Sequence, residues 1–166
     1  MICLQMICAQ IVLAYPPRKV AIMYTTNHSA DTQASPEQVW AAIKALHSGT
    51  RLSERSDVFE LHGPFELGTE LSVTPQGQGT FRSKIVEFVE HRVYADCTEY
   101  EGLTLLFRHT LTPNAHGTTV THELVIDGPS VDVMGPIVGP QISDDFPVAM
   151  ADLFAAATHL EVTAGR

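Results

Sequence analysis

The sequence predicts an α+β fold in which a curved antiparallel sheet of six or seven strands wraps around one long C-terminal helix. The first observation is a series of short β-prone runs joined by short turns, which favours antiparallel strands because parallel strands need long crossovers. The second is the segment 143–161, whose apolar residues recur at helical spacings of three and four. A sheet that is apolar on one face has to be covered, and this segment is the longest helical candidate.

The composition indicates one globular domain. The chain has 166 residues, of which 45% are hydrophobic and 17% are charged. A net charge of −9 without a cluster of Lys or Arg argues against a nucleic-acid partner, because phosphates bind basic side chains. The 3 cysteines have no paired spacing, and no CxxC or HxxxH motif occurs, so we expect no disulfide framework, metal site or cofactor. We expect a cytoplasmic protein, and nothing in the sequence indicates its oligomeric state.

Residues 1–18 are expected to lie outside the fold. The run Met1–Ala14 is apolar but short for a membrane span, and it lacks the basic residues of a signal peptide. The motif YPPRK that follows breaks regular structure. We interpret 1–18 as an N-terminal extension, such as an upstream start site would add, with a short amphipathic anchor as the alternative. The domain then spans 19–162, residues 163–166 form a tail, and no stable membrane insertion is expected.

Regular elements follow one another from Val20 onward. The β-prone run Val20–Thr32 predicts the first strand. A helix should begin at Pro36, because Ser35 is a favourable N-cap residue and Gln38 completes a capping box. Its buried face would consist of Val39, Trp40, Ile43 and Leu46. A short helix or a turn is expected after it, at 47–55. Further strands are expected at 57–62, 69–74, 80–89, 92–100, 103–112 and 118–127.

The C-terminal part of the chain combines a proline-rich stretch with the long helix. Residues 128–142 contain several prolines and glycines, which predict a loop or a broken helix. The long helix follows at 143–161, with Asp144 and Asp145 in positions where N-cap acceptors belong. Its apolar stripe consists of Phe146, Met150, Leu153, Phe154, Ala157 and Leu160.

This order of elements resembles the START-like, or Bet v 1-like, helix-grip superfamily. The resemblance covers about residues 20–162, and it is carried by the motif ASPEQVW at 34–40, the strand start at Gly68 and Thr69, the sheet, and the closing helix. Within this SRPBCC group, the chain is most similar to polyketide cyclase/dehydrase-type and lipid-transport proteins. The resemblance implies an apolar cavity between the sheet and the long helix. Members range from ligand carriers to cyclases and chaperone accessories, so no catalytic residue is transferred.

Strand alternation indicates which side chains face that cavity. In 103–112 the odd positions are the more apolar ones, which places His109 on the inner face. In 118–127 the even positions carry Val120, Leu124 and Ile126, which places His122 on the inner face as well.

Short turns predict how three of the strands pair. A four-residue loop at 114–117 would place His109 opposite His122. A two-residue turn at 101–102 would place Tyr94 opposite His109. The three side chains would then form one row across the inner face, and a slip of one residue on any strand would turn its members outward.

The same turn places Asp96 one step from this row, opposite Phe107. The cluster could orient a ligand carbonyl or phenol, or move a proton near neutral pH. The candidate catalytic residues are therefore His109, His122, Tyr94 and Asp96. The alternative is a set of buried polar residues that bond to one another or to water, and we weigh structural and ligand-orienting roles above catalysis. A metal ligand set is a weaker alternative, because nothing in the spacing requires it.

The sequence is consistent with three alternative functions. The first is a carrier or sensor that binds a small hydrophobic molecule, such as a lipid, a polyketide or an aromatic compound. The second is a cyclase or dehydratase that uses His109 and His122 as acid and base. The third is a protein-interaction module whose cavity is filled. The expected ligand-binding residues are Tyr94, Asp96, Leu105, Phe107, His109, His122, Leu124, Phe146, Met150 and Phe154.

Overall fold

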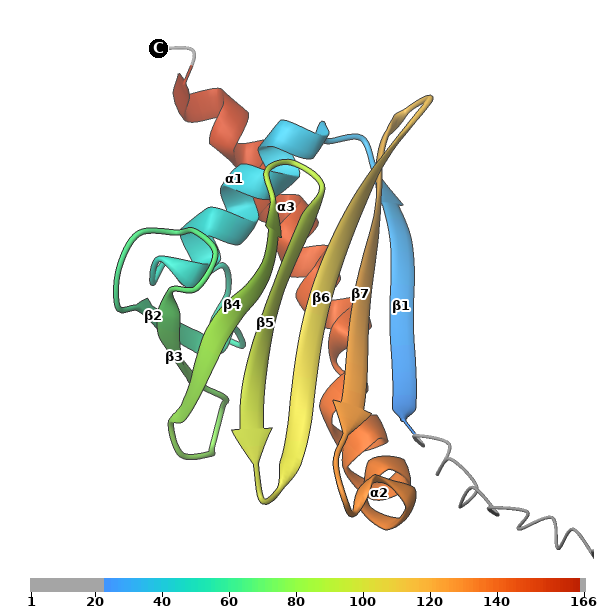
Figure 1. Cartoon of the computed structure of the whole chain (residues 1–166). Helices are drawn as coiled ribbons and strands as arrows, with labels where there is room; N and C mark the ends of the chain where they lie inside the picture. The colour runs from blue at the N-terminus through green and yellow to red at the C-terminus, as the bar shows by residue number, and fades with distance from the viewer. Residues whose placement is uncertain (1–22, 165–166) are drawn as a thin grey trace, which may run out of the picture.

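The computed structural model describes residues 23–164, and its elements appear in Figure 1. The strands are β1 (Tyr24–Thr32), β2 (Val58–Leu61), β3 (Glu70–Thr74), β4 (Phe81–Val89), β5 (Val93–Tyr100), β6 (Leu103–Asn114) and β7 (Gly117–Asp127). The helices are α1 (Pro36–His47), α2 (Val131–Ser143) and α3 (Phe146–Ala164). The extension expected at 1–18 lies outside the described residues.

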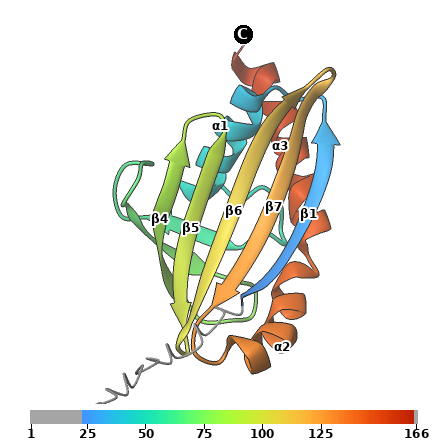
Figure 2. The same cartoon turned by 45° about the vertical axis from the view of Figure 1, so that its right-hand side comes forward.

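The seven strands form one antiparallel sheet, which confirms the predicted fold class. Their order across the sheet is β1-β7-β6-β5-β4-β3-β2. Helix α3 runs along one face of the curved sheet, with α1 near one end of it and α2 near the other (Figures 1 and 2). All the expected strands are present with small differences at their ends within the described residues, and residues 20–22 of the expected first strand lie outside them. His47 ends α1, and residues 48–55 form turns and bends rather than a second helix.

Helix α1 begins as the sequence predicts. The side chain of Ser35 accepts a hydrogen bond from the backbone N–H of Gln38, and the Gln38 side chain accepts one from the backbone of Ser35 at 2.5 Å. The buried residues of the helix include Val39, Trp40 and Ile43. The indole of Trp40 packs edge-on against other aromatic rings, so this helix is fixed to the core at the end of the sheet opposite α2.

Helix α2 is the main departure from the predicted elements. The stretch expected as a loop or broken helix contains a helix of 13 residues, although Pro136 and Pro140 lie inside it. Both prolines are on its exposed side. Gly135 and Gly139 are buried on the other side, where the ring of Tyr24 on β1 packs against them. Close packing of the two glycines against this ring stabilises a segment that has poor helix propensity.

The junction between α2 and α3 corrects the expected start of the long helix. Asp144 ends α2 in a helical conformation, and α3 begins only at Phe146. The backbone carbonyl of Asp145 accepts the first hydrogen bonds of α3, from Val148 and Ala149. The two aspartates therefore separate two helices, and the chain turns between them.

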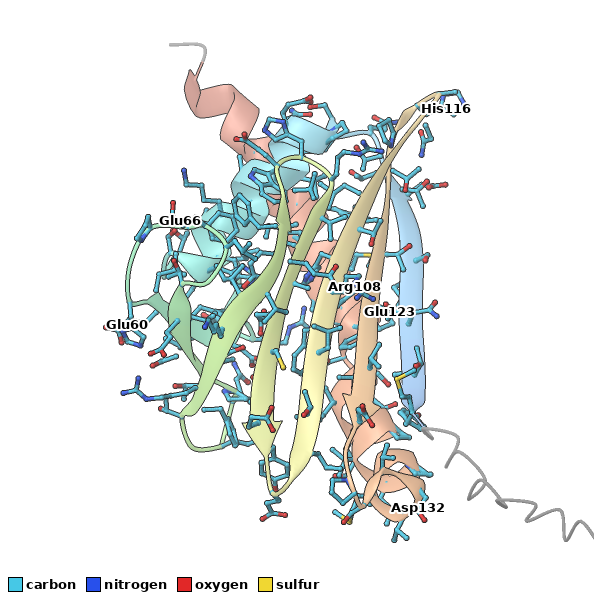
Figure 3. The ribbon with its side chains drawn as sticks, in the orientation of Figure 1. Glu60, Glu66, Arg108, His116, Glu123 and Asp132 are labelled. Atoms are coloured by element: carbon cyan, nitrogen blue, oxygen red, sulfur yellow. The ribbon has the colours of Figure 1, made fainter. Side chains whose placement is uncertain are left out.

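An ion-pair group on the outer face of the sheet joins β4, β6 and β7. The guanidinium of Arg108 donates to Glu87 at 2.9 Å and to Glu123 at 2.6 Å, and Figure 3 shows Arg108 and Glu123 together on this face. A β-bulge lies between Ile85 and Glu87, so Ile85 faces the core while Glu87 faces outward. Because neighbours alternate, the residues next to Arg108 and Glu123, His109 and His122, point to the inner face.

The packing of α2 gives a testable prediction for Gly139→Ala. A Cβ added at this position overlaps the ring of Tyr24, so we expect the free energy of unfolding to fall by about 1–3 kcal/mol in urea titrations. The control is Gly79→Ala, where a Cβ meets no atom within 4 Å and the expected change is much smaller. Equal stability of the two variants would show that α2 does not depend on this contact.

Candidate ligand-binding site

A cavity of about 660 Å³ lies between the inner face of the sheet and α3. Its wall combines apolar and aromatic side chains, contributed by all three helices and by strands β2 to β7, with a substantial number of polar and charged ones. The predicted ligand-binding residues that border it are Asp96, Leu105, Phe107, His109, His122, Phe146 and Met150. Exposed residues such as Arg55, Gln76 and Gln141 also border it, and they mark where it meets solvent.

Three of the predicted ligand-binding residues are not part of this wall. The ring of Tyr94 is fully buried, stacks on Phe65 at 5.3 Å and lies 4.4 Å from the ring of His47. Leu124 is fully buried in the apolar cluster around β6 and β7. Phe154 packs against the cluster that contains Trp40. The alternation argument places side chains on the correct face of a strand, but it does not tell which of them other side chains cover.

The row of polar residues has the register expected from the turns. Tyr94 pairs with His109 and His109 pairs with His122 across three strands. Strand β1 extends the row, since His28 lies opposite His122. The ring of His122 is stacked between its neighbours, at 4.0 Å from His109 and 3.9 Å from Phe146. The cavity therefore has a wall made of three stacked rings.

Burial keeps these histidines neutral. It lowers the pKa of His122 to about 3 and the pKa of His109 well below 6.5, with further lowering by neighbouring histidines. His109 Nδ1 is buried and has no hydrogen-bond partner among the described residues. A neutral pair with such low pKa values is poorly matched to proton exchange near pH 7. The two rings are better suited to contact a ligand than to act as acid and base.

His47 is a polar residue of the cavity that the sequence analysis missed. It lies in the last turn of α1, and its Nδ1 is 2.8 Å from the carbonyl oxygen of Ile43. Because a carbonyl only accepts, Nδ1 carries the proton and Nε2 carries a lone pair. Burial lowers the pKa of His47 to about 4, which keeps the ring neutral. The spacing of four between Val39, Ile43 and His47 places all three on the buried face and could have identified it.

Asp96 is a buried carboxylate at the inner end of the cavity. Its Oδ1 accepts a hydrogen bond of 2.6 Å from the hydroxyl of Ser83, and its Oδ2 lies 3.9 Å from Nε2 of His47. Burial raises the pKa of Asp96 to about 6, against the opposing effect of the bond from Ser83. The hydroxyl of Tyr94 lies nearby without making a hydrogen bond of good geometry to any described residue. Asp96 is thus the group of this cluster that changes charge close to neutral pH.

Further carboxylates lie where the cavity opens. Asp152 accepts a hydrogen bond of 2.7 Å from Ser53 and lies 3.8 Å from the guanidinium of Arg55, which ties the loop after α1 to α3. Burial raises the pKa of Asp57 and of Asp145, and the charge of Asp145 raises the pKa of Asp57 further. Within residues 23–164 no three His, Cys, Asp or Glu side chains are grouped closely enough to hold a metal ion. In the same range no helix is long and apolar enough to span a bilayer.

Comparisons with known proteins agree with this architecture. A family model described as polyketide cyclase/dehydrase and lipid transport matches residues 23–158. No curated protein matches the chain in sequence. Norcoclaurine synthase from Thalictrum flavum, solved with dopamine and hydroxybenzaldehyde, has a similar structure, with a TM-score of 0.61 at 18% identity over 85% of this chain and 88% of that one.

Two further solved structures show the same likeness. Ara h 8.0201 has a TM-score of 0.59 at 16% identity and covers 85% of this chain and 99% of its own. A protein from Mesorhizobium loti has a TM-score of 0.61 at 14% identity and covers 81% of this chain and 97% of its own. At these identities the likeness establishes the Bet v 1-like helix-grip fold.

The burial of Asp96 predicts a pH dependence of stability. A pKa raised from 3.8 to about 6 means that folding favours the protonated carboxyl, so this stabilisation is complete below pH 3.8 and is lost as the pH rises through about 6. Relative to Asp96→Asn, the wild type should gain up to about 3 kcal/mol in free energy of unfolding between pH 7 and pH 4.

Urea unfolding of both proteins at several pH values measures this difference. The buried histidines make stability fall as the pH falls, which is the opposite trend. Both proteins share this contribution, so it cancels when the wild type is compared with Asp96→Asn. Ser83→Ala should move the gain to higher pH, because it removes the hydrogen bond that favours the charged carboxylate. Parallel stability curves for wild type and Asp96→Asn would contradict the burial of an ionisable group at this position.

Proposed function

The chain belongs to the polyketide cyclase/dehydrase and lipid transport family, and from this premise we propose that it binds a small hydrophobic molecule as a carrier or sensor. The observation that carries the proposal is the cavity between the sheet and α3. Its volume of about 660 Å³ is in the range of small-molecule sites, and such sites combine apolar walls with a few polar groups.

The wall of the cavity favours an aromatic or otherwise planar ligand. Phe107 and Phe146 border the cavity together with the stacked rings of His109 and His122. Flat π-faces of this kind bind planar rings by offset stacking, and neutral histidines contribute such faces without adding charge. The fold similarity to an enzyme solved with dopamine and hydroxybenzaldehyde supports the same ligand class.

A second candidate is an enzyme that performs acid–base chemistry on the bound molecule. Asp96 favours it, since its pKa of about 6 lies close to neutral pH and its carboxylate borders the cavity. The acid–base role is thereby better placed on Asp96 than on His109 and His122. Ligand turnover that Asp96→Asn abolishes, while binding persists, would establish the enzyme. A protein-interaction module ranks lower because it needs no internal space of this size.

Blocking the cavity tests the proposal. Ala149 on α3 borders the cavity and is exposed, so Ala149→Trp should fill the opening without disturbing the core. We expect the wild type to bind the neutral fluorescent probe N-phenyl-1-naphthylamine. At a free concentration tenfold above Kd, the probe should raise Tm by about 3–6 °C. The variant should lose most of both effects.

Ala151→Trp is the matched control. It places the same side chain at an exposed position of the same helix that does not border the cavity, so probe binding should remain unchanged. If Ala149→Trp bound the probe as well as the wild type does, the probe would lie elsewhere. The proposal would also be wrong if the wild type bound no lipophilic compound at all.

A further inference from the structure

We propose that the inner end of the cavity is a subsite for a hydrogen-bond donor, so that the ligand is an aromatic molecule whose hydroxyl group lies between Asp96 and His47. This inference rests on the proposed function and specifies the chemistry of its ligand. The two residues come from different elements, β5 and α1, and both border the cavity. The geometry that points to a hydroxyl is the arrangement of their acceptor atoms.

Two acceptor atoms face each other at this point without bonding. Nε2 of His47 carries a lone pair because Nδ1 donates to the carbonyl of Ile43. Oδ2 of Asp96 lies 3.9 Å from it, which is too long for a hydrogen bond. A ligand hydroxyl that enters here has one proton and can donate it to one of the two atoms, and the charged carboxylate oxygen is the stronger acceptor. Two facing acceptors thus leave a place for a donor.

The protein supplies little to satisfy this carboxylate. The hydroxyl of Ser83 already donates to Oδ1, the other oxygen of Asp96. The one cation among the described residues that border the cavity is Arg55, which is exposed and paired with Asp152. The hydroxyl of Tyr94 lies close enough to lower the pKa of Asp96, but it makes no hydrogen bond of good geometry to a described residue. A buried carboxylate that has one well-formed hydrogen bond and no counter-ion is costly, and a ligand donor lowers that cost.

The surroundings of Asp96 favour a neutral donor over a cation. Ser83 on β4, Tyr94 on β5 and His47 on α1 are the polar groups that lie against it, and none of them adds a negative charge. An ammonium group would have to lose its water in exchange for one carboxylate, whereas a hydroxyl is desolvated at much lower cost. The stacked rings of His109, His122 and Phe146 border the same cavity, and a flat ring attached to the hydroxyl would contact them.

A series of naphthalenes with one changed substituent tests the subsite. Isothermal titration of the full-length protein at pH 7.5 would compare 2-naphthol, which donates, with 2-methoxynaphthalene, which only accepts. We expect 2-naphthol to bind about tenfold more tightly, as for a hydrogen bond to a charged group. Asp96→Asn replaces the carboxylate by an amide that can donate, so it should remove or reverse this preference. The matched control Asp57→Asn makes the same change where the cavity opens and should keep the preference.

A pH titration of ligand binding to the wild type tests the same subsite without depending on the folding of a variant. The protonated carboxyl of Asp96 becomes a donor, so the preference for 2-naphthol should fall as the pH is lowered from 7.5 through about 6. The histidine beside it, His47, stays neutral in this range, because burial lowers its pKa to about 4; burial also lowers the pKa of His109, which borders the same cavity. A preference that stays constant between pH 7.5 and pH 5 would overturn the assignment to Asp96.

The remaining outcomes separate this inference from the proposed function. Equal affinities for 2-naphthol and 2-methoxynaphthalene would remove the donor subsite and leave a ligand-binding cavity. Tighter binding of 1-(naphthalen-2-yl)methanamine, which is an ammonium at pH 7.5, would assign the subsite to a cation and overturn the hydroxyl. If no naphthalene bound and the neutral fluorescent probe did not bind either, the proposed function itself would be wrong.

Discussion

The register in which β5, β6 and β7 pair is the constraint on which the cavity depends. Successive side chains of a strand point to opposite faces, so a slip of one residue would turn the inner row outward and bring charged residues into the core. The outer face opposes such a slip, because Arg108 on β6 forms ion pairs with Glu123 on the neighbouring strand β7 and with Glu87 on β4, beyond β5. His109 and His122, the next residues along their strands, are thereby directed toward α3.

The polar groups inside this sheet differ in the charge they carry. Burial makes the three histidines that border the cavity neutral at physiological pH, so they act as flat rings and hydrogen-bonding groups. Asp96 is exceptional, because a pKa of about 6 leaves it mostly ionised there. Keeping that charge buried costs about 3 kcal/mol, a considerable fraction of the 5–15 kcal/mol by which domains are typically stable. A cost of this size at a cavity wall is typical of a residue retained for binding or chemistry.

Local patterns in the sequence predict much of this structure, while contacts between distant elements do not follow from them. The capping box at Ser35 and the turns at 101–102 and 114–117 are local signals, and they lead to the correct helix start and strand register. Helix α2 does not follow from local propensity, because its glycines are explained by the ring of Tyr24, a residue more than a hundred positions away. Ser83 could not be assigned to Asp96, since the β-bulge in β4 and the pairing of β4 with β5 place it there.

The central claim is that the cavity holds a small hydrophobic molecule, and native mass spectrometry of the purified full-length protein tests it most directly. The account predicts a species heavier than the chain by the mass of one small organic molecule, either as purified or after incubation with lipophilic compounds. That species should disappear under denaturing conditions, and extraction should yield an aromatic compound with a hydroxyl group. A protein that is unliganded as purified, and that stays so with every lipophilic compound offered, would contradict the account.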